Sequence, residues 1–213
     1  PSLVTRDALR GVFHVHTRWS DGVDSIESIA NAAKGMGFEY IGIADHSASA
    51  FYAGGLDADA VRRQWDEIDG LNERNAGIHI FKGIECDIRA DGALDYDDAL
   101  LEGFDFVIAS IHSKLRMTRD EATARLVRAS AHPCVTMIGH PTGRLLLARD
   151  GYPLDMVALL DSCARHGTLI ELNADPHRLD LDWRHHRDAK IRGVSVSINP
   201  DAHSIMGLAN VYY

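Results

Sequence analysis

Histidines and acidic residues recur in this sequence at spacings that would suit metal ions. The pair His14-x-His16 near the start is matched near the end by Asp201-x-His203. Side chains two residues apart on a strand point to the same side, so both members of each pair can reach one ion. Between the pairs stand five further residues of metal-binding type: Asp21, His46, Glu85, His112 and His140.

These nine side chains comprise six imidazoles and three carboxylates, with no thiolate among them. Imidazole mixed with carboxylate suits zinc, manganese or iron in a reactive site better than it suits a structural zinc site. Nine ligands are too many for a single ion. The residue types therefore predict a cluster of two or three divalent metals.

Short apolar runs and amphipathic stretches alternate along the chain. Strands are predicted at residues 11–16, 40–44, 78–84, 104–111, 135–138, 169–172 and 194–198. Helices are predicted at 24–36, 57–73, 119–131, 154–165 and 183–191, the first capped by Asp24 or Ser25. Repeated strand–helix units indicate an α/β fold with a parallel sheet. The number of units favours closure into a barrel, and an open doubly wound sheet is the alternative.

The predicted strands explain how residues so distant in sequence could meet. Each of the nine stands at the end of a predicted strand or shortly after it. Side chains at the carboxyl ends of parallel barrel strands converge on one mouth. One histidine in such a place is usually structural, but six after five different strands, with three acids, predict a shared site. The longest irregular stretch, residues 89–98, is predicted to form a loop over one barrel end.

Composition limits the class of protein. A chain of 213 residues, 46% hydrophobic and 25% charged, is expected to form one globular domain. No apolar run is long enough for a membrane span. Cys86, Cys134 and Cys163 are widely spaced and suit a reduced, cytoplasmic setting. The net charge of -9 argues against a broad nucleic-acid-binding surface, although three divalent ions would add about +6 at the site.

The ordered motifs resemble those of the polymerase and histidinol phosphatase (PHP) superfamily over residues 9–213. The first is Gly-Val-Phe-His14-Val-His16-Thr-Arg-Trp-Ser-Asp21-Gly, and the later ones are Ala-Asp45-His46-Ser, Gly-Ile-Glu85, Ala-Ser-Ile-His112-Ser, Gly-His140-Pro-Thr-Gly-Arg144 and Asn-Pro-Asp201-Ala-His203. The fifth motif and Glu-Leu-Asn173-Ala-Asp-Pro look most like the C-terminal PHP domain of bacterial family X DNA polymerases.

This resemblance implies a distorted seven-stranded (β/α)7 barrel with three divalent ions (Mn, Zn or Fe). A single PHP domain would span 1–213, and a start at Pro1 suggests a C-terminal fragment of a longer polymerase. By motif position the first ion would take His14, His16, Glu85 and Asp201, the second Asp21, His46 and His203, and the third Glu85, His112 and His140. Phe13 and Pro200 depart from the family pattern without removing a ligand.

Catalytic roles are predicted for Glu85 and Asp201, which hold metals, and for Arg144, which could fork onto a phosphate. The alternative for Arg144 is a surface salt bridge. Asp45 would orient a neighbouring ligand or cap the next turn, and Asn173 would position substrate or satisfy a strand-end carbonyl. Histidines outside the motifs are not expected to bind metal: His79, His132, His166, His177, His185 and His186.

Three functions are compatible with these features. Two metals that share a water lower its pKa and bind phosphate oxygens, so phosphate esters would be hydrolysed in line without a phosphoenzyme. The polymerase resemblance implies a 3′-5′ exonuclease acting on single-stranded DNA ends, with Lys114 and Arg116 as candidate backbone contacts. The alternatives are a free-standing phosphatase for histidinol phosphate or a nucleotide, and a PHP domain kept only as scaffold. A basic strip leading to the mouth would favour nucleic acid, and a small closed pocket would favour a monoester.

Overall fold

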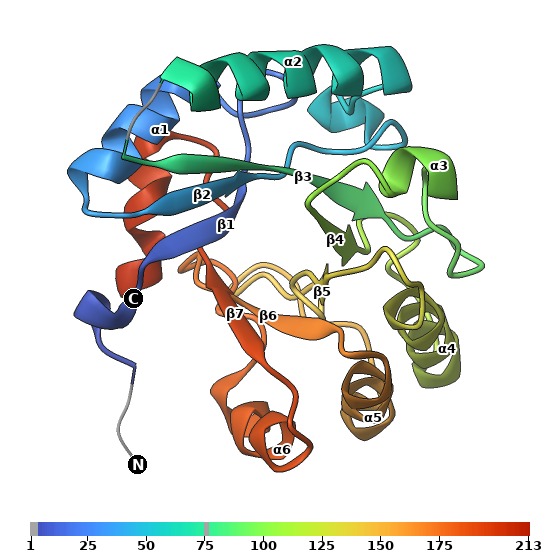
Figure 1. The fold of residues 1–213 in the computed structure, drawn as a ribbon. Coiled ribbons are helices and arrows are strands. Elements are labelled where there is room, and N and C mark those ends of the chain that lie inside the picture. The colour runs from blue at the N-terminus through green and yellow to red at the C-terminus, as the bar shows by residue number, and fades with distance from the viewer. Residues whose placement is uncertain (1–3, 75–76) are drawn as a thin grey trace.

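A computed structural model describes residues 4–74 and 77–213 and places seven parallel strands side by side in the order of the sequence. Figure 1 shows them as a ring of strands with helices outside it. Their bounds are β1 (Gly11–Val15), β2 (Tyr40–Ile43), β3 (His79–Asp87), β4 (Phe106–Ser110), β5 (Met137–Ile138), β6 (Leu169–Asn173) and β7 (Val196–Asn199). The predicted α/β barrel is confirmed.

The ring closes between β1 and the segment that follows β7. Val15 forms a parallel bridge with Ala202. The backbone N–H of His16 donates to the carbonyl of Ala202 at 2.8 Å, and the N–H of Ala202 donates to the carbonyl of His14 at 3.2 Å. Closure therefore occurs at the carboxyl ends of the strands, the end that we call the mouth, and it brings the two sequence-distant histidine motifs together.

Strand β3 distorts the barrel because its two halves pair with different neighbours. Its first half, through Lys82, lies against β2, and its second half, from Gly83, lies against β4. The predicted strand stopped at Ile84, three residues short of Asp87. The apolar pattern ends there because Glu85 and Asp87 are polar, yet both are buried as interior strand residues.

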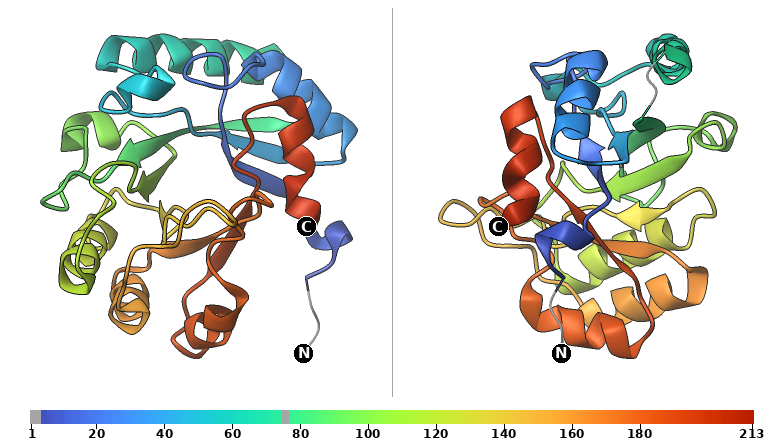
Figure 2. Two further views of the ribbon diagram at one scale, coloured as in Figure 1. Left: turned by 180° about the vertical axis from the view of Figure 1, so that it is seen from behind. Right: turned by 60° about the vertical axis from the view of Figure 1, so that its left-hand side comes forward.

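Helices cover the outside of the ring, as the turned views in Figure 2 show. They are α1 (Ile26–Gly35), α2 (Ala58–Arg74), α3 (Asp98–Leu101), α4 (Arg119–Ser130), α5 (Met156–His166) and α6 (His186–Ile191). Short 3-10 helices add η1 (Arg6–Ala8), η2 (Phe51–Ala53), η3 (Trp183–His185) and η4 (Ile205–Tyr212). The five predicted helices correspond to α1, α2, α4, α5 and the pair η3 and α6, whereas α3, η1, η2 and η4 were not predicted.

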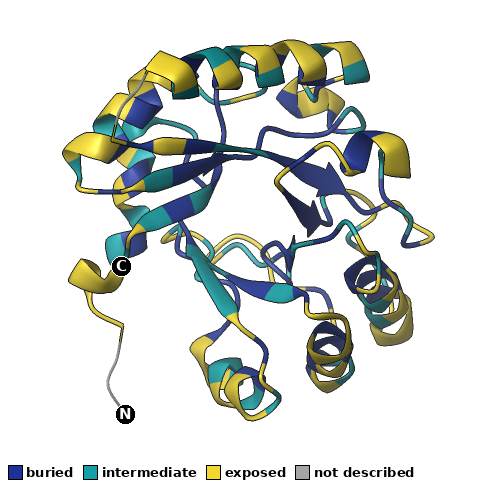
Figure 3. Ribbon diagram, in the orientation of Figure 1, coloured by how far each residue is buried: buried dark blue, intermediate teal, exposed yellow. Residues whose placement is uncertain are grey.

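Local sequence explains where the helices begin. The side chain of Ser25 accepts a hydrogen bond from the N–H of Ser28, so Ser25 and not Asp24 caps α1. Thr118 and Glu121 form a reciprocal capping box at the start of α4. Buried helix faces turn toward the strands and exposed faces toward solvent, as expected of amphipathic helices (Figure 3). In the described part of the chain, no helix is long and apolar enough to cross a membrane.

Aromatic rings fill the barrel below the mouth. Phe13 packs against Phe106, with ring centroids 4.8 Å apart, and against Phe81. The glycines at 42 and 83 leave room for these rings, because a Cβ at Gly83 would lie 2.0 Å from the Phe106 ring. This aromatic plug forms the floor on which the mouth residues rest.

The prediction that residues 89–98 form the longest irregular stretch is wrong. The longest segment without a helix or a strand joins β5 to α5 and covers residues 139–155. Strand β5 is only two residues long, so most of this connection lies at the mouth. Two of the predicted site residues, His140 and Arg144, stand in it.

Candidate metal centre

Glu85 lies at the centre of the mouth, close to the imidazoles of several strands. Its Oε1 is 2.8 Å from Nε2 of His140 and 3.2 Å from Nε2 of both His14 and His112. The side chain is only 1% exposed. A carboxylate placed among imidazoles that come from separate strands has the position expected of a bridging ligand.

The second oxygen of Glu85 and one oxygen of Asp201 enclose the next imidazoles. Glu85 Oε2 lies 3.1 Å from Nδ1 of His46 and 3.6 Å from Nε2 of His16. Asp201 Oδ1 lies 3.2 Å from Nε2 of His16 and 3.5 Å from Nε2 of His14. Two ligand atoms held about 2.1 Å from one ion are separated by roughly 3.0–3.5 Å, so these distances fit a shared metal shell.

Asp21 closes the outer side of the centre. Its Oδ2 lies 3.4 Å from Nε2 of His203 and 3.5 Å from Nε2 of His46. The rings of His16 and His203 stack with centroids 4.2 Å apart. Asp21 and His203 are more exposed than the other ligands, so this side of the centre faces solvent.

Ligand atoms of the nine residues fall into four overlapping groups, each with donors within 4.8 Å of one another. The groups are His14–His16–Asp201, His16–Asp21–His46–His203, His14–Glu85–His140 and His46–Glu85–His112. The structure thus brings together all nine predicted residues. It differs from the predicted assignment in detail, because His16 also joins the second set and Glu85 pairs with His112 and His140 in separate groups.

Backbone conformation at the mouth is unusual at three of these residues. His14, His140 and Asp201 have φ values of 58°, 22° and 49°, in the region that side chains rarely adopt. Neighbouring residues of a strand normally face opposite sides. Between Val12 and Val15 the pairing of β1 with β2 shifts register, and as a result Phe13 and His14 both face the inside of the barrel. Strained backbone of this kind gathers at functional sites, where it fixes the direction of a side chain.

The acids hold their charge because the imidazoles surround them. Burial alone would raise the pKa of Glu85, but the nearby His112, His14 and His46 outweigh burial and lower it well below its usual range. Burial would also raise the pKa of Asp201, and His14 and His16 lower it instead. Both carboxylates are therefore ionised and can act as metal ligands.

The imidazoles respond in opposite directions. Burial, together with the neighbouring His46 and His203, lowers the pKa of His16 to about 4. Burial would lower the pKa of His112 as well, yet Glu85 and Asp87 raise it to about 10. An imidazole beside ionised carboxylates, such as His112, stays protonated unless a metal cation takes the place of the proton. The carboxylates therefore favour a bound cation.

Several ring nitrogens at the mouth are buried without a hydrogen-bond partner among the described residues. They are Nε2 of His14, both ring nitrogens of His16, Nδ1 of His46 and Nδ1 of His140. A buried polar atom left without a partner costs free energy, and most such atoms in proteins are satisfied. Converging unpartnered nitrogens beside ionised carboxylates fit a divalent metal cluster.

Glu171 supports the centre from below and was missed by the sequence reasoning. Its Oε1 accepts from Nδ1 of His14 at 2.6 Å and from Asn199 at 2.9 Å. Its Oε2 accepts from the backbone N–H of His140 at 2.7 Å and lies 3.4 Å from the amide of Asn173. A carboxylate on Nδ1 directs Nε2 of His14 toward the mouth. The signal was available, because a glutamate interrupts the apolar strand β6.

Asp87 and Asp45 orient two further parts of the centre. Asp87 accepts from Nδ1 of His112 at 2.5 Å. Asp45 accepts from the N–H and hydroxyl of Thr17, from Ser20 and from Gln64, at 2.5–2.8 Å. These bonds hold the loop that carries Asp21. Of the two roles considered for Asp45, the structure supports that of orienting a ligand.

Asn173 and Asp201 are joined by a hydrogen bond despite the departure at Pro200. The amide of Asn173 donates to Asp201 Oδ2 at 2.9 Å, so Asn173 orients a predicted ligand. Despite Pro200, Asp201 reaches the mouth, with Oδ1 3.2 Å from His16 Nε2. The histidines not expected to bind metal belong to none of the four groups.

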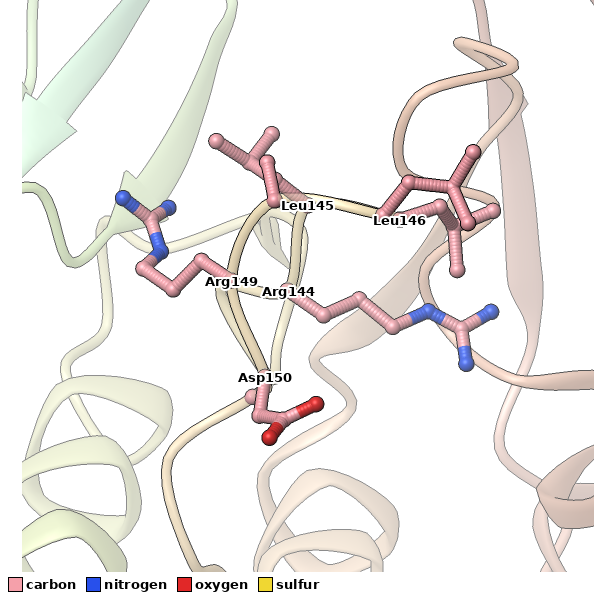
Figure 4. A pocket seen from close by; sticks show the side chains of 8 residues that line it. Arg144, Leu145, Leu146, Arg149 and Asp150 are labelled. Carbon is pink, nitrogen blue, oxygen red and sulfur yellow. The ribbon is translucent and has the colours of Figure 1, made fainter.

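Arg144 does not face the predicted ligands. Its guanidinium donates to Asp182 at 2.6 Å and to the carbonyls of Arg178 and Leu179. Figure 4 shows Arg144 and Arg149 pointing to opposite sides of their loop. These contacts tie the guanidinium to the 178–182 segment, and the ion pair with Asp182 is the salt bridge considered as the alternative, so Arg144 braces this segment.

Arg178 occupies the position expected of Arg144. It lines the cavity over the centre, and its Nε lies 3.3 Å from Oδ2 of Asp201. Its side chain is 18% exposed. Sequence reasoning could not select it, since Arg178 stands in a long loop and lies outside the recognised motifs.

Comparison with known proteins agrees with this geometry. The sequence profile of the PHP domain matches residues 13–189. The chain is 42% identical over 203 residues to the DNA polymerase/3'-5' exonuclease PolX of Bacillus subtilis (strain 168). The aligned region is 95% of this chain but only 36% of that protein, so this chain spans about a third of the polymerase. It is 28% identical over 207 residues to a probable phosphatase of Thermoanaerobacter sp. (strain X514), covering 89% of this chain and 77% of the relative.

Solved structures share the fold at lower identity. A candidate histidinol phosphatase from Listeria monocytogenes superposes with a TM-score of 0.72 at 11% identity, over 93% of this chain and 97% of that one. The histidinol phosphate phosphatase of Lactococcus lactis, solved with zinc, L-histidinol and phosphate, gives 0.62 at 17% identity, over 95% and 92%. From the matched profile, the relatives and the mouth geometry, this chain belongs to the PHP domain family of metal-dependent phosphoesterases.

Proposed function

We propose that this domain removes nucleotides from the 3′ ends of single-stranded DNA by metal-dependent hydrolysis of phosphodiester bonds. The observation that carries the proposal is the set of nine side chains whose donor atoms converge around Glu85. The relative that is 42% identical is named as a 3'-5' exonuclease, which supports the choice of substrate.

The proposed ligands are the nine predicted residues, sharing three divalent ions of zinc, manganese or iron. When bound, such ions polarise phosphate oxygens and lower the pKa of a coordinated water. Glu85 would bridge, because its two oxygens face different imidazoles. Asp201 would hold His14 and His16 in a common shell, and Asn173 keeps Asp201 in place through the 2.9 Å hydrogen bond.

Arg178 is the proposed phosphate-binding side chain. A guanidinium forks onto a phosphate more readily than other donors do, and Arg178 lines the same cavity as the ligands. Its contact with Asp201 at 3.3 Å holds it at the edge of the centre. We infer that Arg178 orients a nonbridging oxygen of the scissile phosphate.

The surroundings of the mouth favour a long substrate over a small monoester. The cavity over the ligands has a volume of about 150 Å³. It shares Arg178, Asp201 and His203 with a neighbouring cavity of about 390 Å³, so it is not closed. Lys114 and Arg116 are exposed on the loop after β4 and have no ion-pair partner in the described part of the chain. Together these features suit a charged strand that extends beyond one phosphate.

A free-standing phosphatase is the second candidate, favoured by the shared fold with the Lactococcus lactis enzyme solved with histidinol and phosphate. A scaffold without activity is the third. It conflicts with the mouth geometry, because a scaffold has no need for nine converging ligand side chains.

The test uses metal-stripped protein reloaded with manganese or zinc. Hydrolysis of p-nitrophenyl phosphate, histidinol phosphate and 3′-labelled single-stranded DNA is compared for the wild type and for His112→Ala. His166→Ala is the matched control, because His166 is exposed at the end of α5, outside the four groups. Release of nucleotides that requires metal and His112, but not His166, supports the proposal.

Other outcomes separate the alternatives. Turnover of a monoester alone would favour the phosphatase, and binding of metal without any hydrolysis would favour the scaffold. Arg178→Met tests the phosphate contact. It should lower kcat/KM on DNA by about 10- to 100-fold, as expected for loss of a charge-assisted hydrogen bond, without changing metal content.

A further inference from the structure

Two large aromatic side chains project into solvent beside the mouth. Phe51 is 87% exposed and Tyr52 is 72% exposed, and both stand on η2. Exposed aromatic residues scattered singly are common, but here two are adjacent in the chain and one of them, Tyr52, lines the cavity over the predicted ligands, which needs a reason.

The backbone that carries the two rings is firmly held. Ala50 and Ala53, on either side of the rings, are buried, and their backbones are joined by a 2.9 Å hydrogen bond. The N–H of Leu56 donates to the carbonyl of His46 at 2.9 Å, which ties the segment to a predicted ligand. Its small residues pack inward while Phe51 and Tyr52 point out, so the exposure of the rings follows from the fold of this segment.

The position of Tyr52 links the rings to the metal centre. Its ring centroid lies 6.4 Å from that of His46. Tyr52 lines the cavity over the centre together with Arg178 and Glu85. A substrate phosphate in this cavity would therefore place the group attached to it within reach of the Tyr52 ring.

The opposite side of the mouth is built differently. The neighbouring cavity of about 390 Å³ has an apolar side, Leu145, Leu146 and Ala148 from the 139–155 loop, and a polar side made by Asp175, His177, Arg178, Asp201 and His203. It joins the central cavity through Arg178, Asp201 and His203. The mouth thus has an aromatic side chain at one side, a mixed apolar and polar wall at the other, and the predicted ligands between them.

We propose that Phe51 and Tyr52 form a stacking platform for a nucleobase next to the scissile phosphate, so that the site prefers single-stranded nucleic-acid ends to small phosphate monoesters. This inference rests on the proposed exonuclease function. Every base has a flat face that can stack on an aromatic ring, and such stacking tolerates any sequence.

A nucleobase fits this place better than a protein partner or a lipid surface would. Two rings on a three-residue helix are a small patch, and the cavity beside them is lined by charged groups. Lys114 and Arg116, exposed on the loop after β4, supply positive charge for the phosphates of a strand. A flat ring face next to a phosphate site is the combination that single-strand-binding proteins use.

The experiment compares two oligonucleotides, one with normal bases throughout and one with abasic sugars at the two 3′-terminal positions. Steady-state kinetics in manganese are measured for the wild type, Phe51→Ala/Tyr52→Ala and Phe51→Trp/Tyr52→Trp. p-Nitrophenyl phosphate serves as a substrate without a strand; because its ring can itself stack, the abasic oligonucleotide is the control for stacking. Tyr213→Ala is the matched control, because Tyr213 is 83% exposed beside Leu9, at the opposite end of the barrel.

We expect the double alanine variant to raise KM for the normal oligonucleotide by about 10- to 100-fold, with the double tryptophan variant close to wild type. The wild type should itself bind the abasic oligonucleotide weakly, and on that substrate it should not differ from the double alanine variant. Tyr213→Ala should match the wild type on both.

Two results would overturn the stacking platform alone. The first is that the wild type degrades the normal oligonucleotide and the double alanine variant does so with the same KM. The other is an equal loss on normal DNA, abasic DNA and p-nitrophenyl phosphate, which would point to a disturbed metal centre. If the wild type hydrolyses p-nitrophenyl phosphate but no oligonucleotide, the proposed exonuclease function fails and the platform fails with it.

Discussion

Replacing Glu171 by glutamine should weaken metal binding without altering any predicted ligand. Both oxygens of Glu171 accept hydrogen bonds, Oε1 from His14 and Asn199 and Oε2 from the backbone of His140. Burial would raise the pKa of Glu171, but the charge and hydrogen bond of His14 lower it, so the side chain is ionised. Glutamine has the same shape but only one accepting oxygen.

Either orientation of the new amide creates a conflict. If its NH₂ faces His14, the ring must accept at Nδ1 and carry its proton on Nε2, the atom 3.2 Å from Glu85. That tautomer cannot bind a metal through Nε2. If the NH₂ faces His140, two N–H groups oppose each other in a fully buried place.

The expected cost follows from these two cases. Loss of a carboxylate that orients a ligating histidine lowers metal affinity by about 10- to 100-fold, or about 1.4–2.7 kcal/mol. A buried donor left without a partner costs about 1–3 kcal/mol of stability. The first orientation therefore lowers metal affinity by about tenfold or more, whereas the second lowers the stability of the fold by about 1–3 kcal/mol.

Competition with a chelator of known affinity, applied to metal-stripped protein, measures the loss. Glu73→Gln is the matched control, since it removes the same charge from an exposed position on α2. Thermal unfolding of the metal-free proteins shows how much of the loss is structural. If Glu171→Gln matches Glu73→Gln in both metal affinity and thermal unfolding, the two hydrogen-bonded oxygens of Glu171 do not support the centre.

Three further predictions concern stability. Burial raises the pKa of Asp180 to about 6 despite hydrogen bonds from Thr142. Because this pKa exceeds the unfolded value of about 3.9, protonated Asp180 contributes to the stability of the folded state below pH ~4, and this contribution is lost as pH rises through 6. Urea unfolding of metal-free protein should therefore show the wild type losing up to about 3 kcal/mol relative to Asp180→Asn between pH 4 and 7, and parallel pH profiles would contradict this. Gly83→Ala should cost about 1–3 kcal/mol, because its Cβ would lie 2.0 Å from Phe106. In the same urea series Gly35→Ala, an exposed helical position with open space, should not destabilise, and equal effects of the two would contradict the packing argument. Chelation should lower the Tm, because metal at about 100 times its Kd stabilises the folded state by about 2.7 kcal/mol. A Tm that does not change, although elemental analysis shows that the metal has been removed, would refute this prediction.

Periodic features of the sequence were sufficient for the architecture. Alternating apolar runs and amphipathic stretches located all seven strands, because buried parallel strands are continuously apolar. Their ends were less certain. Strand β3 continues through Glu85, Cys86 and Asp87, where the sequence turns polar but the chain remains inside the barrel. The 3-10 helix η2 went unnoticed for a related reason, since its Phe51 and Tyr52 are apolar yet face solvent.

Residue type and position after a strand were also sufficient to nominate the nine proposed ligands. The carboxyl ends of parallel strands meet at one end of a barrel whatever the details of packing, so residues there converge. Hydrogen bonds of the supporting residues depend on which side chains face one another across the barrel. Glu171 on β6 contacts His14 on β1, a pairing that no local pattern encodes.

Arg144 and Arg178 also differ in a way that the local sequence does not predict. Residue types at the mouth, the barrel and the motifs that carry the family resemblance could all be inferred from the printed residues. The folded chain was needed to show that Arg144 is bound to Asp182 while Arg178 lines the cavity, and that Phe51 and Tyr52 are exposed, with Tyr52 lining the same cavity. The positions of the strands follow from short-range periodicity. The direction of a loop side chain depends on partners supplied by distant segments, which become neighbours only when the barrel closes.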